Sequence, residues 1–278
     1  MTGTDEASDR EALQHGELNV LGRMRTASNA TFLCEAGWTG HSVHCVYKPV
    51  AGEQPLWDFP DGTLAGRERG AYLVSTALGW NIVPYTIIRD GPAGLGMLQR
   101  WVDQPGDTDD ADDTDDSEPA GPDLVDLCSP GSVPPGYLSV LRAHDYAGND
   151  VALVHADDPR LRRMAVFDVI INNADRKGGH ILAGVDGRVY GVDHGVSLHV
   201  QDKLRTVLWG WAGKPIDDET LESVSALGEQ LSGPLAEELR DHITAAEIAA
   251  LRRRVRALLK EPVMPGPDRQ RPIPWPAF

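Results

Sequence analysis

The Gly-rich stretch ADRKGGHILAGVDGRVYGVDHG, residues 174–195, contains two aspartates, Asp175 and Asp193, and a histidine, His180, whose positions could serve chemistry. Asp175 follows an apolar helical run, His180 comes five residues later, and Asp193 follows a short apolar run. Two short strands joined by a turn at Asp186-Gly187 would bring both carboxylates to one end of a two-stranded ribbon. This layout suits phosphoryl transfer, in which one carboxylate takes the proton of an acceptor hydroxyl and the other holds a metal on nucleotide phosphates. We therefore take Asp175 as the catalytic residue and Asp193 as the metal ligand.

A lysine and a glutamate that could serve the same chemistry precede this stretch. Phosphoryl transfer needs a lysine that neutralises phosphate charge and a glutamate that orients the lysine. Lys48 ends a strand-like run in VYKP, and Glu68 stands near the start of a helix in GRERGAY. The predicted order of two strands, a lysine strand, a glutamate helix, two strands and a connector is the order that such a lobe requires.

The segments around these residues resemble the phosphatidylinositol 3/4-kinase-like family. The likeness is greatest to the type II phosphatidylinositol 4-kinases and their bacterial relatives, and HipA-like kinases resemble the chain more distantly. FDVIINNADRKGGHIL is similar to the family's D-Y-hydrophobic-hydrophobic-x-N-x-D-R-x-x-x-N, with Asp168 seven residues before Asp175. YGVDHGVSLH is similar to its hydrophobic-D-N/H-G-hydrophobic segment, and VLWGWAGKP resembles an aromatic stretch downstream. In patches, the resemblance covers residues 17–215.

The resemblance implies ATP with Mg²⁺ or Mn²⁺ as cofactors. It implies a phosphate loop over residues 22–31, and position along the chain favours an adenine-facing connector after the last strand of the first lobe. The residues concerned are Ser28, Asn29 and Ala30 in the loop, and Gln99, Trp101 and Val102 in the connector. Asp168 interrupts an apolar helical run, and a buried aspartate needs a partner such as Arg176. We therefore expect Asp168 to brace the catalytic loop.

His180 departs from the family pattern, which has asparagine as a second metal ligand at this position. A neutral imidazole can bind a divalent metal, but magnesium prefers oxygen ligands, and manganese or zinc accepts nitrogen more readily. Three alternatives stay open: His180 is a metal ligand, the site uses one metal through Asp193, or the site is catalytically silent. A structural histidine that points away from any metal is also compatible with the sequence.

The strand and helix pattern predicts an α+β chain with two lobes. Residues 17–50 alternate as strands with a hairpin at WTG, residues 67–79 form a helix, and VPYTIIRDG and GLGMLQRWV form two further strands. A helix starts at the Asp-Pro of DPRLRRMAVFDVIINNA, and residues 217–260 form two helices divided at SGP. We expect a protein-kinase-like fold, with an ATP cleft between a strand-rich N-lobe and a helical C-lobe.

Composition divides the chain into five segments. The stretch 103–123 carries ten carboxylates and no lysine or arginine, which predicts a disordered acidic insert. Residues 263–278 are rich in proline, and this composition predicts a segment that lies on the surface. The boundaries are a disordered N-terminus at 1–14, the N-lobe at 15–102, the acidic insert at 103–123, the C-lobe at 124–262 and the Pro-rich tail at 263–278.

Charge and cysteine usage exclude several classes of protein. A net charge of −16 argues against a nucleic-acid partner, which normally meets a basic surface. Three cysteines without a C-x-x-C pair indicate reduced thiols. The first residues lack the basic and apolar regions of a signal peptide, and no apolar run is long enough for a transmembrane segment. These features predict a cytoplasmic protein.

The sequence therefore favours an ATP-dependent phosphotransferase that moves a γ-phosphoryl group to a hydroxyl acceptor. The acceptor is left open between lipid and protein, since a lipid head group is implied only by the resemblance. Two alternatives are a pseudokinase, meaning a nucleotide-binding module without turnover, and a nucleotidyl transferase that binds ATP in the other orientation. A protein that only mediates interactions is disfavoured by the presence of Lys48, Asp175 and Asp193.

Overall fold

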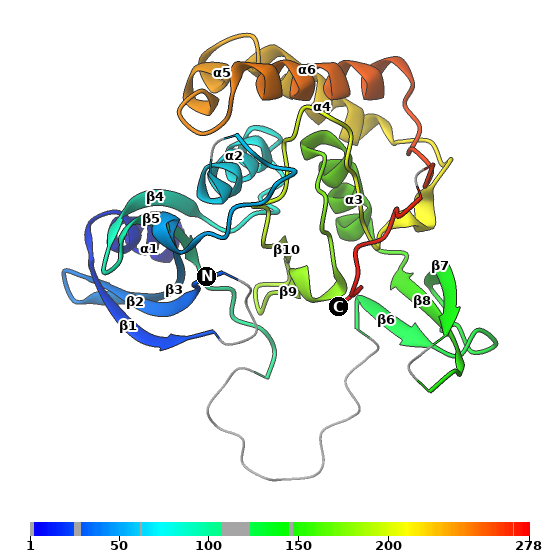
Figure 1. The fold of residues 1–278 in the computed structure, drawn as a ribbon, viewed down its shortest axis with the longest axis horizontal. Helices are drawn as coiled ribbons and strands as arrows, with labels where there is room; N and C mark the ends of the chain where they lie inside the picture. Colours follow the sequence, from blue (N-terminus) through cyan, green and yellow to red (C-terminus); the bar gives the residue numbers. More distant parts are fainter. Residues whose placement is uncertain (1–2, 25–28, 62, 107–122, 145–146, 269) are drawn as a thin grey trace.

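A computed structural model describes residues 3–24, 29–61, 63–106, 123–144, 147–268 and 270–278 (Figure 1). Two sequence predictions fall outside this range. Residues 107–122 make up most of the predicted acidic insert, and Ser28 belongs to the predicted phosphate loop.

The first lobe is a five-stranded antiparallel sheet with the order β1-β2-β3-β5-β4. The predicted hairpin at WTG is confirmed, because Thr39 and Gly40 both adopt the positive φ that a tight turn needs. The helix α2 follows β3 after a loop, and Thr63 caps it by accepting a hydrogen bond from Gly66 N. The elements are β1 (Glu17–Arg23), β2 (Phe32–Trp38), β3 (His41–Pro49), α2 (Leu64–Ala77), β4 (Thr86–Gly91) and β5 (Gly94–Arg100).

The prediction of a disordered N-terminus at 1–14 is wrong for residues 3–14, because α1 (Gly3–His15) is a helix. Leu13 is fully buried in the apolar cluster of the sheet. Asp9 pairs with His41 at 2.8 Å and with Arg100 at 3.4 Å. Helix α1 is stabilised by these tertiary contacts and has no apolar stripe of its own. The polar composition of residues 1–14 therefore predicts disorder when it is considered without the contacts.

A second sheet, which the sequence did not predict, opens the second lobe. It contains β6 (Val125–Cys128), β7 (Tyr137–His144) and β8 (Asp150–Ala156) in the antiparallel order β6-β8-β7. Figure 1 shows it on the opposite side of the molecule from the first sheet. The second lobe is therefore not helical from residue 124, as we expected, but from residue 159 onward.

The rest of the second lobe is built around α3 (Pro159–Ile171), which starts at the predicted Asp-Pro signal. Asp158 caps the helix by accepting a hydrogen bond from Arg160 N, and Asn172 ends it with a φ of 55°. The predicted small hairpin is confirmed as β9 (Ile181–Ala183) paired with β10 (Val189–Gly191). The two helices predicted in 217–260 are three: α4 (Asp218–Gln230), α5 (Pro234–Leu239) and α6 (Ala245–Lys260).

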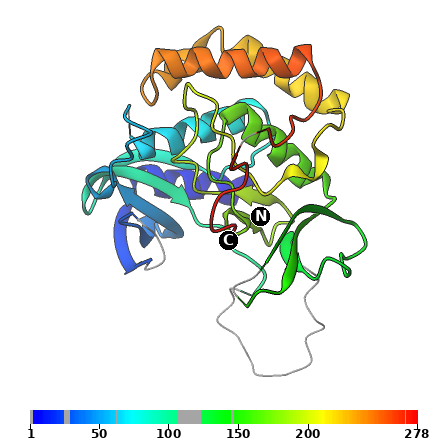
Figure 2. The same ribbon diagram turned by 45° about the vertical axis from the view of Figure 1, so that its right-hand side comes forward.

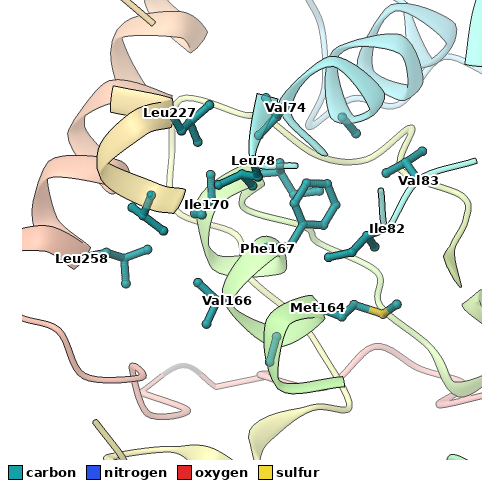
Figure 3. Packing of buried hydrophobic residues seen from close by; sticks show 14 of the residues in the cluster. Val74, Leu78, Ile82, Val83, Met164, Val166, Phe167, Ile170, Leu227 and Leu258 are labelled. Carbon is teal, nitrogen blue, oxygen red and sulfur yellow. The ribbon is translucent and has the colours of Figure 1, made fainter. Parts of the chain in front are cut away.

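The main apolar core lies between α3, α2 and the last helices (Figure 3). Phe167 and Ile170 of α3 are fully buried and pack with Val74 of α2 and Leu227 of α4. Because α3 leads directly into the loop that carries Asp175, this core fixes the position of that loop.

The prediction of an α+β fold with a strand-rich first lobe and a mainly helical second lobe is confirmed (Figures 1 and 2). Within the part of the chain that the structure describes, no helix combines the length and the apolar character needed to cross a membrane.

Candidate functional site

A cavity of about 960 Å³ lies between the two lobes and contains the predicted chemistry. Lys48 and Glu68 line it from the first lobe, and Asp175, His180 and Asp193 line it from the second. The predicted nucleotide-contacting residues that lie in the described range also line this cavity; they are Asn29, Ala30, Gln99, Trp101 and Val102.

Lys48 lies between two carboxylates that come from different lobes. Its Nζ donates to Glu68 Oε1 at 2.9 Å and to Asp193 Oδ1 at 2.8 Å. Burial alone would lower the pKa of the Lys48 ammonium, but the Asp193 and Glu68 carboxylates outweigh burial and raise that pKa. In turn, Lys48 holds the pKa of the Asp193 carboxyl well below its usual value. At neutral pH the Lys48 side chain is therefore protonated and the Asp193 side chain is ionised.

Glu68 ties helix α2 to the loop that follows β10. Its side chain is almost fully buried, with Oε1 on Lys48 and Oε2 accepting a hydrogen bond from His194 N at 2.9 Å. One carboxylate thus orients the lysine and also holds the backbone beside Asp193. The role predicted for Glu68 from sequence included only the first of these contacts.

Asp193 adopts a left-handed backbone conformation with a φ of 61°. This region is uncommon for residues other than glycine, although Asp and Asn tolerate it better than most. Strained backbone of this kind concentrates at functional sites. Here it places the Asp193 carboxylate within reach of both Lys48 and His180.

A buried network braces the loop that carries Asp175. Arg176 donates from Nε and Nη2 to the two oxygens of Asp168, at 3.0 and 2.9 Å. Asn173 Nδ2 donates to Asp168 Oδ1 at 3.0 Å, and the Arg176 Nη2 also contacts His194 Nε2 at 2.7 Å. Both members of the ion pair are completely buried. The bracing role predicted for Asp168 is confirmed.

Asp175 lies at the start of the braced loop and faces the cavity. Asn173 Oδ1 accepts a hydrogen bond from the Asp175 backbone N at 3.0 Å, and Lys177 Nζ pairs with Asp175 Oδ2 at 3.2 Å. Burial raises the pKa of the Asp175 carboxyl, and Lys177 opposes that shift. The result is a carboxylate that is more basic than one in water.

His180 faces Asp193, with His180 Nε2 3.4 Å from Asp193 Oδ2. Burial lowers the pKa of the imidazole, so that His180 is neutral at pH 7. Its buried Nδ1 has no hydrogen-bond partner among the described residues. Over the same residues there is no group of three or more His, Cys, Asp or Glu that could hold a metal ion. The His180 imidazole and the Asp193 carboxylate are the two candidate metal ligands from the sequence, and they contact each other in this cavity.

The predicted nucleotide residues have individual polar contacts. Asn29 Oδ1 accepts a hydrogen bond from Gln54 N at 2.9 Å, which ties the predicted phosphate loop to the loop after β3. Gln99 is buried, and its Nε2 donates to Thr86 Oγ1 at 2.9 Å. Its side chain therefore supports the strand β5, and the connector residues Trp101 and Val102 remain on the cavity wall.

Comparison with known proteins gives one strong relative. Protein Rv2133c of Mycobacterium tuberculosis is 69% identical over 270 residues, which is 97% of this chain and 95% of the relative. The chain belongs to the same family as protein Rv2133c. No family model matches the chain. The crystal structure of the Helicobacter pylori proinflammatory kinase CtkA is 9% identical, covers 90% of this chain and 93% of its own, and has a TM-score of 0.45. A likeness of that degree does not identify a function.

Sequence reasoning missed one further part of the site, the loop between β3 and α2. Glu53 accepts hydrogen bonds from Leu64 N and Ala65 N, at 2.9 and 2.8 Å, and so caps α2. Asp58 pairs with Lys203 of the second lobe at 3.1 Å. The sequence did not predict this contact between the lobes, because the loop is rich in Gly and Pro and such a composition predicts only a turn.

We expect Glu68→Gln to lower the free energy of unfolding by about 1–3 kcal/mol, because a charged and buried hydrogen-bond partner of Lys48 is lost. The amide still accepts one hydrogen bond, so the chain should fold. Chemical denaturation measures the change, with Glu222→Gln on the exposed face of α4 as the control. Equal stability of the two variants would show that the contacts of Glu68 contribute little.

Proposed function

We propose that this chain is a kinase, an ATP-dependent phosphotransferase that moves the γ-phosphoryl group to a hydroxyl acceptor. The observation that carries the proposal is Lys48, held between Glu68 and Asp193 across the two lobes at the cavity that Asp175 also lines. This is the set of groups that phosphoryl transfer requires, and the set comes from separate elements of both lobes.

Each residue has a role in this proposal. Lys48 exchanges its contact with Asp193 for the phosphates of ATP, and Glu68 keeps it oriented. Asp175 orients the acceptor hydroxyl and takes its proton, for which the raised pKa of its carboxyl is an advantage. The connector at Trp101 and Val102 receives the adenine ring. The buried brace of Asp168 and Arg176 keeps Asp175 in place.

A divalent metal fits the residues of the site. The Asp193 carboxylate and the His180 imidazole are both potential metal donors, and His180 Nε2 lies 3.4 Å from Asp193 Oδ2. Mg²⁺ or Mn²⁺ held there would neutralise charge on the transferred phosphate. The class of acceptor follows from the resemblance alone, which favours a lipid or a protein hydroxyl.

One observation favours a pseudokinase as the second candidate. Lys48 and His180 both contact Asp193 directly, and these contacts satisfy its carboxylate without a metal. If this arrangement persists in the presence of nucleotide, ATP would bind without transfer.

Product analysis tests the proposal. The purified protein is incubated with ATP, either Mg²⁺ or Mn²⁺, and lipid or peptide hydroxyl acceptors, and the nucleotides are separated by chromatography. ADP is the product expected from γ-phosphoryl chemistry. AMP with pyrophosphate would indicate nucleotidyl transfer instead, and intact ATP together with measurable binding would support the pseudokinase.

We expect His180→Asn to retain turnover and to shift the metal preference toward magnesium. Asparagine supplies an amide oxygen, a hard donor that magnesium accepts, whereas the imidazole nitrogen suits manganese better. Turnover of both proteins is measured across magnesium and manganese titrations. Identical metal profiles in a stably folded variant would remove His180 from the metal site and leave Asp193 as its protein ligand.

A further inference from the structure

Residues 270–278, here called the 270–278 strap, are anchored at two points of the second lobe. Pro272 O accepts hydrogen bonds from Thr206 N and from Trp209 Nε1, each at 3.0 Å. Ala277 O accepts a hydrogen bond from Gly178 N at 2.8 Å. In Figure 1 the red trace runs from the end of α6 to the region of β9. The Pro-rich tail therefore lies on the surface as expected, with Trp275, Pro276 and Phe278 exposed, but these hydrogen bonds fix it in place there.

The second anchor lies on the catalytic loop itself. Gly178 is buried, and a Cβ added to it would lie 2.4 Å from Phe278 Cε1 and 2.6 Å from Phe278 Cδ1. The ring therefore rests on the Gly178 backbone, and only glycine permits that approach. Asp175 is three residues before this contact and His180 is two residues after it.

The strap also reaches the cavity. Pro276 and Phe278 line the same cavity as Asp175 and His180. Phe278 is 47% exposed, whereas Trp275, the residue before Pro276, is 78% exposed and does not line the cavity. The strap meets the cavity beside Gly178 of the second lobe, because Phe278 abuts Gly178 and Ala277 O accepts the hydrogen bond of Gly178 N. In the proposed reaction this is the acceptor side.

We propose that the 270–278 strap is part of the active site. Phe278 is a positioning residue that holds the catalytic loop at Gly178, and with Pro276 it forms the acceptor-side wall of the cavity. This inference rests on the proposed kinase function for its effect on transfer, and on the contacts above for its effect on the loop.

The physical reason is the composition of the loop. Gly178 and Gly179 are adjacent, and glycine has more backbone freedom than any other residue. Without an external contact, this pair would let Asp175 and His180 move relative to each other. Because reacting groups must be held within a fraction of an ångström, a loose loop lowers the rate of transfer while leaving nucleotide binding unchanged. The expected loss of turnover for Phe278→Ala is about tenfold.

A double-mutant cycle tests the contact between the loop and the strap. Gly178→Ala places a methyl group where the Phe278 ring lies, so it should raise amide hydrogen exchange across residues 176–180 and slow ADP formation. Phe278→Ala should have the same two effects. In the Phe278→Ala background, Gly178→Ala should add little, because the obstacle is gone. Phe278→Tyr keeps the ring and should restore both readouts.

Two control variants separate this contact from general damage. A Cβ at Gly179 meets nothing within 4 Å, and this residue has no positive φ, so Gly179→Ala should leave the exchange of the loop at or below its wild-type level. Trp275→Ala changes an exposed strap residue and should leave exchange and the Mg–ATP dissociation constant unaltered.

The outcomes distinguish this inference from the proposed function. The strap is supported as a positioning element if the effects of Gly178→Ala and Phe278→Ala are not additive, both in amide hydrogen exchange and in turnover. The Mg–ATP dissociation constant should stay unchanged. Strictly additive effects, or unchanged exchange in Phe278→Ala, would overturn it. Absence of turnover in the wild-type protein would contradict the kinase proposal. The double-mutant cycle measured by amide hydrogen exchange would still show whether Phe278 restrains the loop at Gly178.

Discussion

Replacing Asp193 with alanine is expected to weaken Mg–ATP binding by at least about 100-fold, while the chain still folds. The variant removes the carboxylate that is paired with Lys48 at 2.8 Å and that would hold the metal. The Asp193 side chain is 51% exposed, so its loss removes little packing. Isothermal titration calorimetry with ATP and Mg²⁺ measures the effect.

A second variant controls for the backbone at this position. Alanine disfavours the left-handed conformation that Asp193 adopts, whereas asparagine tolerates it. Asp193→Asn therefore keeps the shape of the loop and removes the charge. Both variants should lose metal-dependent affinity. Wild-type Mg–ATP affinity in folded Asp193→Asn would show that this carboxylate does not hold the metal.

We expect Asp175→Asn to lower the rate of ADP formation by about 10²–10⁴-fold, which is the range for loss of a general base. Mg–ATP affinity should change little, because the contacts proposed for the nucleotide are made by Lys48, Asp193 and the connector. The amide is isosteric with the carboxylate, so the brace behind it stays intact. Quenched-flow or steady-state assays of ADP measure the rate.

The same residue sets the expected pH dependence. The reaction needs the Asp175 carboxylate in its ionised form, and burial raises the pKa of that carboxyl. Turnover should therefore be full above this raised pKa and decline as the pH falls through it, at a higher pH than for an exposed aspartate. Lys177 opposes the shift, so Lys177→Gln should move the acidic limb further upward. If Lys177→Gln leaves the acidic side of the pH–rate profile unchanged, a group other than Asp175 titrates there.

The gathering of the four candidate residues at one cavity could be predicted because it depends on residue type and spacing. Lys48, Glu68, Asp175 and Asp193 lie far apart in the chain, yet each was placed by the element that precedes it, and all four line one cavity. Local signals sufficed here, since a strand end, a helix start and a tight turn each fix the direction of a side chain.

The missed parts depend on contacts between distant segments. Helix α1 contributes few apolar residues and is held by the burial of Leu13 and the ion pairs of Asp9. The strap around Phe278 has the composition of a surface linker, but its position is set by hydrogen bonds to Gly178 and Thr206. Neither kind of contact leaves a periodic signal in a single sequence.

His180 illustrates a third limit. Its spacing from Asp175 correctly brought it to the cavity, beside Asp193. A neutral imidazole at that position can either bind a metal or donate a hydrogen bond to the Asp193 carboxylate, and the sequence is compatible with both roles. The metal titration of His180→Asn addresses this point directly.

Following labelled ATP tests the central proposal, phosphoryl transfer at Asp175, most directly. ATP labelled at the γ-phosphate and, separately, at the α-phosphate is incubated with the wild-type protein and with Asp175→Asn, together with lipid and peptide acceptors. The account predicts that γ label appears on an acceptor hydroxyl with the wild-type protein, that α label remains in ADP, and that Asp175→Asn binds Mg–ATP but transfers neither. Transfer of α label, or undiminished transfer of γ label by folded Asp175→Asn, would contradict it.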